Sequence, residues 1–443
     1  MMGFSIGSLA SRMNAGDSED TASAKRPPLR RNGAPADPPG PQPGVYTVRR
    51  MNEPREAWVV VWAAFFSLAV IFGVSYSFAA FFEAFAGEFN AQRADVSLVF
   101  GLSGLVYFVC GAGGGMLADR FGPRVVSCVG MLLIAGGLGL SSVAESMAMV
   151  YLAYGAGIGI GIALVYTPAI ACVPPWFTRR RGLAAGLASA GIGAGTVVVP
   201  LLAAWAIEQW QWRVALRAMA VGVLLVGLGA AMLLKRAPLG AVSSAQQRPG
   251  NRLAEALRSR RFWWLYLAVV AAGPSMFIPF AHVSASARDL GLSESRAVGL
   301  VGLIGIGSLV GRFVIGAIAD RLGRVLTLTL MQALAGLSYL VWLGAGSYPA
   351  LAAFALWFGL SYGGIVALLP AICMDLFGAR AVSGIVGTLY TGAALGNLLG
   401  PVIAGAVFDR SGSYTSIIVA CVALSALATL ASARLAALRV SNY

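Results

Sequence analysis

Charged residues are scarce in this chain. Asp, Glu, Lys and Arg make up 11% of the 443 residues, whereas 58% are hydrophobic and the mean hydropathy is +0.77. A soluble globular chain carries about 25% charged residues, so this composition excludes a water-exposed fold and a disordered chain of this size. There is a single histidine, and the five cysteines stand singly inside apolar runs. No metal-ligand spacing or nucleotide-binding loop is visible, so we predict no metal and no cofactor.

Long apolar segments dominate what is present. From Ala57 onward, twelve segments have about 20 residues or more, which is enough to cross a bilayer. They are residues 57–82, 96–118, 125–143, 148–172, 182–207, 214–234, 262–286, 297–318, 325–345, 348–372, 381–408 and 415–438. The sequence therefore predicts an all-α membrane protein with twelve transmembrane helices.

A basic stretch divides these helices into two groups of six. We predict a disordered cytoplasmic tail over 1–56, a six-helix bundle over 57–234, a basic cytoplasmic linker over 235–261, a second six-helix bundle over 262–438 and a short cytoplasmic tail over 439–443. The first tail is rich in Pro and Gly and has no long apolar run, which is typical of disorder.

The net charge of +14 is explained by topology and not by a nucleic-acid partner. If the N-terminus is cytoplasmic, 25 Lys and Arg fall in the cytoplasmic segments and five in the loops on the opposite side. Cytoplasmic loops are enriched in Lys and Arg, so this distribution predicts that both termini are cytoplasmic. We expect the lipid bilayer and a small organic anion as partners.

A short motif follows the second helix of each group, at an offset of 201 residues. Its residues are Gly115, Asp119, Arg120 and Gly122, and then Gly316, Asp320, Arg321 and Gly323. The glycines allow helices to approach closely, and the aspartates can accept from backbone N–H groups or pair with a nearby Arg. We predict a gating role, with a plain solvated turn as the alternative. Two similar halves place a binding site between them, near the bilayer midplane.

The doubled motif resembles the signature of the major facilitator superfamily, and the resemblance extends over about residues 57–438. Three segments, 176–191, 279–292 and 308–316, are similar to monocarboxylate porters and to the bacterial oxalate/formate antiporters. The resemblance implies a gradient-driven carrier with alternating access, working as a monomer in the bacterial inner membrane. It also implies that the arginine of the eighth helix binds carboxylate.

Arg312 is that arginine, and it is also conspicuous on physical grounds. A cation at the centre of a transmembrane helix costs about 2.5–3.5 kcal/mol on insertion scales, so it needs a partner. No Asp or Glu lies within the twelve segments, and a substrate carboxylate fits a guanidinium in bidentate geometry. The alternatives are that Arg312 extends to the cytoplasmic surface or joins Asp320. A single cation fits a monoanion better than a dicarboxylate.

Other polar residues lie within the segments. Tyr166, Tyr362 and Tyr390 can supply hydroxyl donors to an anion, and Asn397 can supply an amide. In this superfamily the helices that carry these tyrosines line the cavity, although each residue taken singly fits packing better than ligand binding. His282 is a candidate for proton coupling, because imidazole changes charge near neutral pH. The alternative is a neutral, hydrogen-bonded histidine packed beneath the outer loops.

The sequence thus predicts a secondary transporter of a small monocarboxylate such as lactate, pyruvate or formate. We expect proton symport, either through His282 or through the substrate's own proton. A carboxylate exchanger, or an exporter of a larger organic acid or drug, is the alternative within transport. A polytopic membrane enzyme or receptor would need a catalytic constellation, which one histidine and no intramembrane carboxylate do not supply.

Overall fold

The computed structural model describes residues 55–177, 180–237, 250–378 and 381–440, which form helices joined by short connections. Before the linker these are α1 Arg55–Tyr76, α2 Phe78–Glu88, α3 Arg93–Phe121, α4 Pro123–Ser141, α5 Met147–Val150, the π-helical turn η1 Tyr151–Ile158, α6 Gly159–Ala171, the short η2 Pro174–Trp176, α7 Arg181–Gly222, the π-helical η3 Val223–Leu228 and α8 Gly229–Leu233. After it come α9 Leu253–Arg258, α10 Arg260–Asp289, α11 Glu294–Leu322, α12 Arg324–Leu343, α13 Tyr348–Phe377, α14 Val382–Ser411 and α15 Thr415–Val440.

Eleven helical stretches in the described ranges are long and apolar enough to cross a membrane. One of them, Leu183–Leu233, has 51 residues. At 1.5 Å per residue it would extend over about 77 Å, against about 30 Å of hydrocarbon. Gln211 interrupts it with a non-helical backbone, φ 68° and ψ 158°. This stretch is therefore two crossings, and the predicted all-α membrane fold is confirmed.

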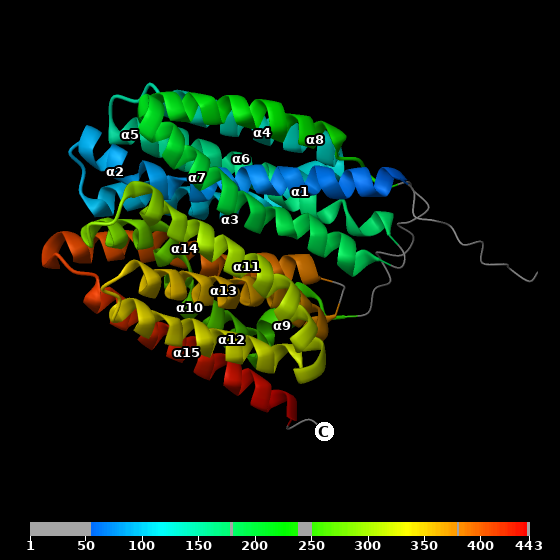
Figure 1. The fold of residues 1–443 in the computed structure, drawn as a ribbon. Helices are drawn as coiled ribbons and strands as arrows, with labels where there is room; N and C mark the ends of the chain where they lie inside the picture. Colours follow the sequence, from blue (N-terminus) through cyan, green and yellow to red (C-terminus); the bar gives the residue numbers. More distant parts are fainter. Residues whose placement is uncertain (1–54, 178–179, 238–249, 379–380, 441–443) are drawn as a thin grey trace, which may run out of the picture. The chain divides into compact units, whose positions relative to one another are not determined.

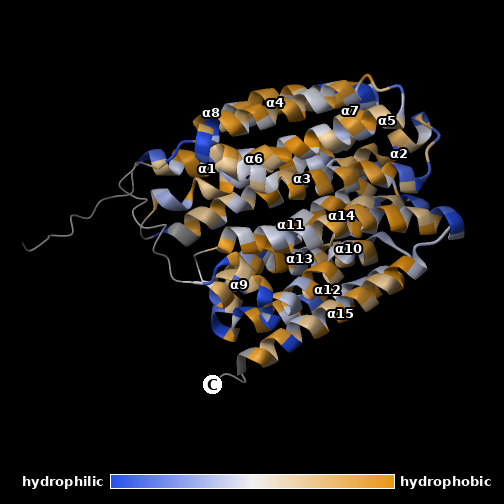
Figure 2. Ribbon diagram, turned by 180° about the vertical axis from the view of Figure 1, so that it is seen from behind, coloured by the Kyte–Doolittle hydropathy of each residue, from blue (hydrophilic) through white to orange (hydrophobic). Residues whose placement is uncertain are grey.

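The helices lie side by side, with those before the linker, the N-terminal half, next to those after it, the C-terminal half (Figure 1). Two helix pairs make the most extensive contacts between the halves: α3 packs along α14, and α7 packs along α11. We call the end where α3 runs into α4 the linker end, and the end where α3 begins the far end. Figure 2 shows hydrophobic residues along the helices and hydrophilic residues gathered towards their ends.

The repeated motif forms the same turn in both halves. Gly122 has φ 93° and ψ 150°, and Gly323 has φ 89° and ψ 136°, a region that only glycine occupies without strain. Each glycine N–H donates to the carbonyl four residues earlier, on Ala118 and Ala319, at 2.9 Å. The motif's last glycine therefore ends one helix and lets the next begin at once.

The remaining motif residues differ between the halves. Asp320 pairs with Arg324 at 3.6 Å, and Arg324 also lies 2.6 Å from Asp375 of α13. A Cβ atom at Gly115 would stand 3.0 Å from a side-chain carbon of Thr167, so helices do approach closely there. No described residue lies within 4 Å of such an atom at Gly316, so the part of the chain that the structure describes makes no close approach at that glycine.

Candidate substrate-binding cavity

A cavity of about 80 Å³ lies between the two halves. Helices α1, α3, α6 and α7 supply its wall from the N-terminal half, and α10 to α14 supply it from the C-terminal half. The polar residues that line it are Ser75, Tyr76, Tyr107, Tyr166, Arg312, Gln332, Tyr362, Tyr390 and Asn397. All five residues predicted to bind substrate are in this set, so the structure brings them to one site.

Arg312 has an unused donor in this cavity. Its Nε atom is buried and has no hydrogen-bond partner, and within the described ranges the side chain forms no ion pair. No Asp or Glu is among the described residues that line the cavity. Asp320, the acidic partner considered from the sequence, pairs with Arg324 instead. A guanidinium placed in this way is available for an anion.

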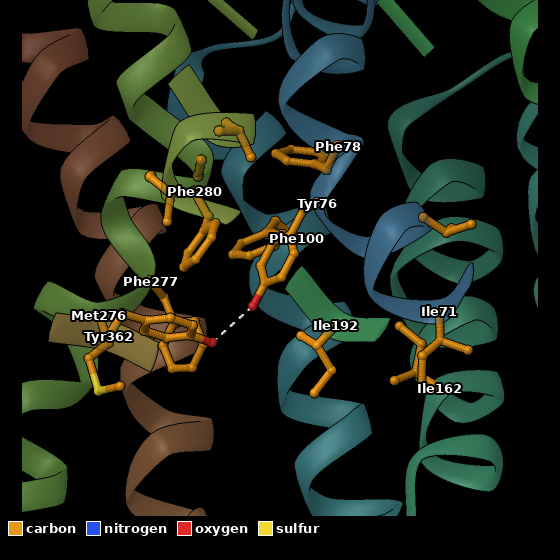
Figure 3. Close-up of a cluster of buried hydrophobic side chains, with 14 of the residues drawn as sticks. Ile71, Tyr76, Phe78, Phe100, Ile162, Ile192, Met276, Phe277, Phe280 and Tyr362 are labelled. Carbon is orange, nitrogen blue, oxygen red and sulfur yellow. Dashed lines mark hydrogen bonds between the residues drawn. The ribbon is translucent and has the colours of Figure 1, made fainter. Parts of the chain in front are cut away.

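Tyrosines line the same cavity as this cation. They are Tyr76, Tyr107, Tyr166, Tyr362 and Tyr390. The Tyr76 and Tyr362 hydroxyls are 3.0 Å apart and reach towards each other from opposite halves (Figure 3). This hydrogen bond ties α1 to α13 across the cavity.

Apolar side chains make the remaining wall, and four of them are phenylalanines: Phe72, Phe100, Phe108 and Phe277. Phe108 of the N-terminal half meets Phe277 and Tyr390 of the C-terminal half, with ring centroids 6.0 Å and 5.7 Å away. Phe72 and Tyr166 are in edge contact at 5.6 Å. Because apolar walls keep the local dielectric low, a charge pair formed here is stronger than one in water.

Asn397 has a structural contact as well as a place in the wall. Its amide nitrogen donates to the carbonyls of Phe100 and Gly101 of α3, both at 3.3 Å. It packs directly on Gly104, where a Cβ atom would stand 1.7 Å from that nitrogen. The side chain therefore ties α14 to α3, and its amide donors are already engaged.

His282 lies away from the cavity wall, fully buried near the far end. Its Nε2 is 2.8 Å from the Pro401 carbonyl and 3.1 Å from the Ser97 hydroxyl, and its Nδ1 is 3.0 Å from the Tyr414 hydroxyl. A carbonyl can only accept, so these partners assign the proton to Nε2 and leave Nδ1 to accept from Tyr414. This environment resembles the packed, hydrogen-bonded histidine considered from the sequence.

Four residues near His282 hold the halves together at the far end, and we call them the far-end clamp: Arg93, Asp289, Asp409 and Tyr414. The Arg93 guanidinium donates to both oxygens of Asp289, at 2.8 Å and 2.6 Å, and to the Tyr414 hydroxyl at 2.7 Å. Asp409 accepts from the backbone N–H groups of Arg93 and Ala94, at 3.1 Å and 3.0 Å. Arg93 and Ala94 start α3, and the other three residues belong to the C-terminal half, so the clamp closes the far end.

Tyr414 connects the clamp to His282. Burial raises the pKa of Tyr414 above its usual range, and the nearby Arg93 guanidinium opposes this shift without cancelling it. The tyrosine therefore keeps its proton and donates it to His282 while it accepts from Arg93. A second contact between the halves lies beside it, since Arg288 approaches Glu83 at 3.8 Å and donates to the Ala79 carbonyl at 3.0 Å.

Sequence reasoning missed the clamp and Gln332. The clamp residues lie at helix ends and in loops, where charged residues are ordinary, so no single one was conspicuous. Gln332 is a neutral amide in an apolar helix and has no charge to draw attention. A lone amide in a transmembrane segment is nevertheless a usable signal, because such groups need partners.

Membrane-spanning helices in two halves, with a cavity between them and a closure at one end, define a transporter. The chain belongs to the major facilitator superfamily, whose family model matches residues 63–387 and 275–442. It is therefore a multi-pass integral membrane protein and a transporter, not an enzyme.

Three curated relatives show which transporters of this superfamily the chain resembles. The chain is 32% identical over 362 residues to monocarboxylate transporter 13 of Bos taurus, covering 81% of this chain and 84% of that one. It is 30% identical over 374 residues to human monocarboxylate transporter 11, covering 81% and 78%. It is 29% identical over 374 residues to the MFS-type transporter opdF of Penicillium oxalicum, covering 81% of this chain and 85% of that one. The protein is thus related to the monocarboxylate transporters.

A solved structure shares the fold. A bacterial homolog of the human lysosomal transporter Spinster, in an inward-facing and unoccupied conformation, matches with a TM-score of 0.68. The match covers 86% of this chain and 98% of that one at 16% identity, so it supports the fold and nothing about function.

Proposed function

We propose that this transporter moves a small monocarboxylate across the membrane by alternating access, with Arg312 binding the carboxylate. The observation that carries the proposal is the buried, unpaired Nε of Arg312 in a cavity whose described wall has no acidic residue. A carboxylate supplies the missing acceptor in a charge-assisted, bidentate geometry. The names of the mammalian relatives support the same class of substrate.

The size of the cavity supports a short acid. Its volume of about 80 Å³ is roughly half that of the ~150 Å³ cavity known to admit benzene. One guanidinium balances one negative charge, which favours a monoanion of a few carbon atoms. Tyr166 and Tyr390 donate further hydrogen bonds from the wall, and the Tyr76–Tyr362 pair has one hydroxyl proton left for the substrate. Asn397 fixes the wall of the site by holding α14 against α3.

Alternating access is supported by the uneven connection between the halves. The far-end clamp closes one end, and the two glycine turns of the repeated motif lie at the other. We place the linker end in the cytoplasm because Lys and Arg concentrate there, with both termini on that side. The setting we propose is the inner membrane of a bacterial cell, with a monomer as the working unit.

Proton symport is the proposed coupling. His282 is outside the cavity wall, so a proton taken up there would act through Tyr414 on the clamp and not on the substrate directly. The second route is a proton carried by the substrate itself. Uptake driven by an imposed proton gradient, compared with counterflow in the absence of any gradient, separates symport from carboxylate exchange.

The decisive experiment is uptake of labelled lactate by proteoliposomes that contain Arg312→Ala. Each hydrogen bond to a charged group contributes about 1.5–3 kcal/mol, so loss of the pair lowers uptake at least tenfold. Arg312→Lys retains the positive charge but loses the paired N–H donors of the guanidinium. Its uptake falls between that of the wild-type protein and that of Arg312→Ala. Arg217→Ala removes another arginine from an apolar stretch, one that does not line the cavity, and leaves uptake unchanged. Normal uptake by a folded Arg312→Ala protein would refute the proposal.

A further inference from the structure

Gln332 presents an unused acceptor to the same cavity. Its side chain is 2% exposed, lies in the wall of the cavity, and its Oε1 atom has no hydrogen-bond partner. A buried polar atom without a partner costs about 1–3 kcal/mol, so one that faces a cavity points to a ligand that satisfies it when bound.

The orientation of this amide is determined by its neighbour. Its Nε2 donates to the backbone carbonyl of Ala268 on α10, at 3.5 Å. Turning the amide over would place two carbonyl-type oxygens against each other, so the oxygen is the free atom. The free group is therefore an acceptor and calls for a donor.

Nearby hydroxyl groups do not supply that donor. Ser275 donates to the Ala272 carbonyl at 2.9 Å, and Ser425 donates to Ser275 at 3.3 Å. Tyr362 pairs with Tyr76 across the cavity. None of these hydroxyls donates to Gln332, whose Oε1 has no partner among the described residues, so this acceptor is left to a ligand.

We propose that the substrate is a hydroxy acid, whose hydroxyl donates to Gln332 Oε1 while its carboxylate is held by Arg312. This assignment rests on the proposed function and makes Gln332 the residue that sets specificity. A keto acid of the same size offers an acceptor where a donor is needed, and an unsubstituted acid offers neither. An amino acid would bring an ammonium group into a cavity with no acidic residue in its described wall, which disfavours it.

Matched acids test the assignment because they differ only at one oxygen. Binding of lactate, pyruvate and propionate to the purified full chain is measured by calorimetry, together with 3-hydroxybutyrate, acetoacetate and butyrate. In each set the hydroxy acid is expected to bind about two- to tenfold more tightly than its two partners, the usual value of one net hydrogen bond. Equal or tighter binding of the keto acids by the wild-type protein overturns the proposal.

The second part of the experiment repeats these measurements on Gln332→Met, which keeps the length of the side chain and removes the acceptor. The three acids of each set should then bind alike, and because ratios are compared, a partial loss of folded protein cancels. Ser361→Ala is the matched control, because the Ser361 hydroxyl is also buried and unpaired but does not line the cavity. A hydroxyl preference that survives in Gln332→Met overturns the role of Gln332.

The same measurements distinguish failure of the hydroxy-acid assignment from failure of the proposed carboxylate site at Arg312. Acids that bind in an Arg312-dependent way without any hydroxyl preference refute only the hydroxy-acid assignment. Acids that bind independently of Arg312, or not at all, refute the carboxylate site itself and the assignment with it.

Discussion

Replacing Asp289 by Asn should loosen the far end without disturbing the cavity. Asp289 accepts two hydrogen bonds from the Arg93 guanidinium, and these join the C-terminal half to the first residue of α3. The Asn side chain keeps one acceptor oxygen but loses the negative charge. The far-end-closed state is therefore weakened relative to the state in which this end is open.

The expected size follows from the geometry. Two charge-assisted bonds contribute about 1.5–3 kcal/mol each when buried. Here the Arg93 and Asp289 side chains are 17% and 35% exposed, so screening by solvent and the remaining Asn acceptor reduce the loss to about 1–2 kcal/mol. That loss corresponds to a shift of roughly 5- to 30-fold in the equilibrium between the two states.

Hydrogen exchange measures this shift on the native chain. The backbone N–H groups of Arg93 and Ala94 are hydrogen-bonded to Asp409 of the opposite half, so they exchange only when the far end opens. Mass spectrometry of the peptide that begins α3 should show exchange that is 5- to 30-fold faster in Asp289→Asn, by the same arithmetic.

Glu88→Gln is the matched control for this experiment. It removes the carboxylate that pairs with Arg213 at 2.8 Å, an ion pair at the same end but within one half. Exchange at the start of α3 should stay at the wild-type rate in this variant. Unchanged exchange in Asp289→Asn, or equal acceleration in both variants, would refute the idea that the clamp holds the far end closed.

Three further expectations concern single residues. Gly122→Ala and Gly323→Ala should each lower the free energy of unfolding by about 1–3 kcal/mol, seen as a lower Tm, because both turns need a glycine conformation; a neutral effect would contradict the shared turn. Tyr362→Phe loses the bond to Tyr76, so the KM for lactate uptake should rise about two- to tenfold, and an unchanged KM would remove this pair from the site. His282→Phe keeps a ring of similar shape but loses its hydrogen bonds, so stimulation of uptake by an imposed proton gradient should disappear; stimulation that persists would assign the coupling proton to the substrate.

The membrane crossings could be predicted from the sequence because long apolar runs permit few other structures. Their ends were harder to place, since local polarity does not mark where a helix stops. The first predicted segment, 57–82, ends within α2, and Ser77 interrupts the helix inside it. Helix α10, Arg260–Asp289, is longer at both ends than the predicted segment 262–286, because its charged ends extend past the apolar run.

Arg312 was accessible from the sequence because a cation inside an apolar run carries a known energetic penalty. Gln332 was not, because its importance depends on an atom left without a partner, and that depends on Ala268 of another helix. The clamp was equally hidden. Arg93 and Asp289 are 196 residues apart, on α3 and α10, and their pairing depends on how both helices pack against α14 and not on any local pattern.

The cap that Asp409 provides for α3 also bears on how the protein is made. The first turn of α3 is synthesised 315 residues before the carboxylate that accepts from its amide groups. Until α14 has entered the membrane, those amides must be satisfied by water or lipid headgroups at the interface. The first half of the chain can therefore insert early, with α3 capped locally by Gln92 and Asp95, yet the Asp409 contacts form only when the last helices assemble against this end.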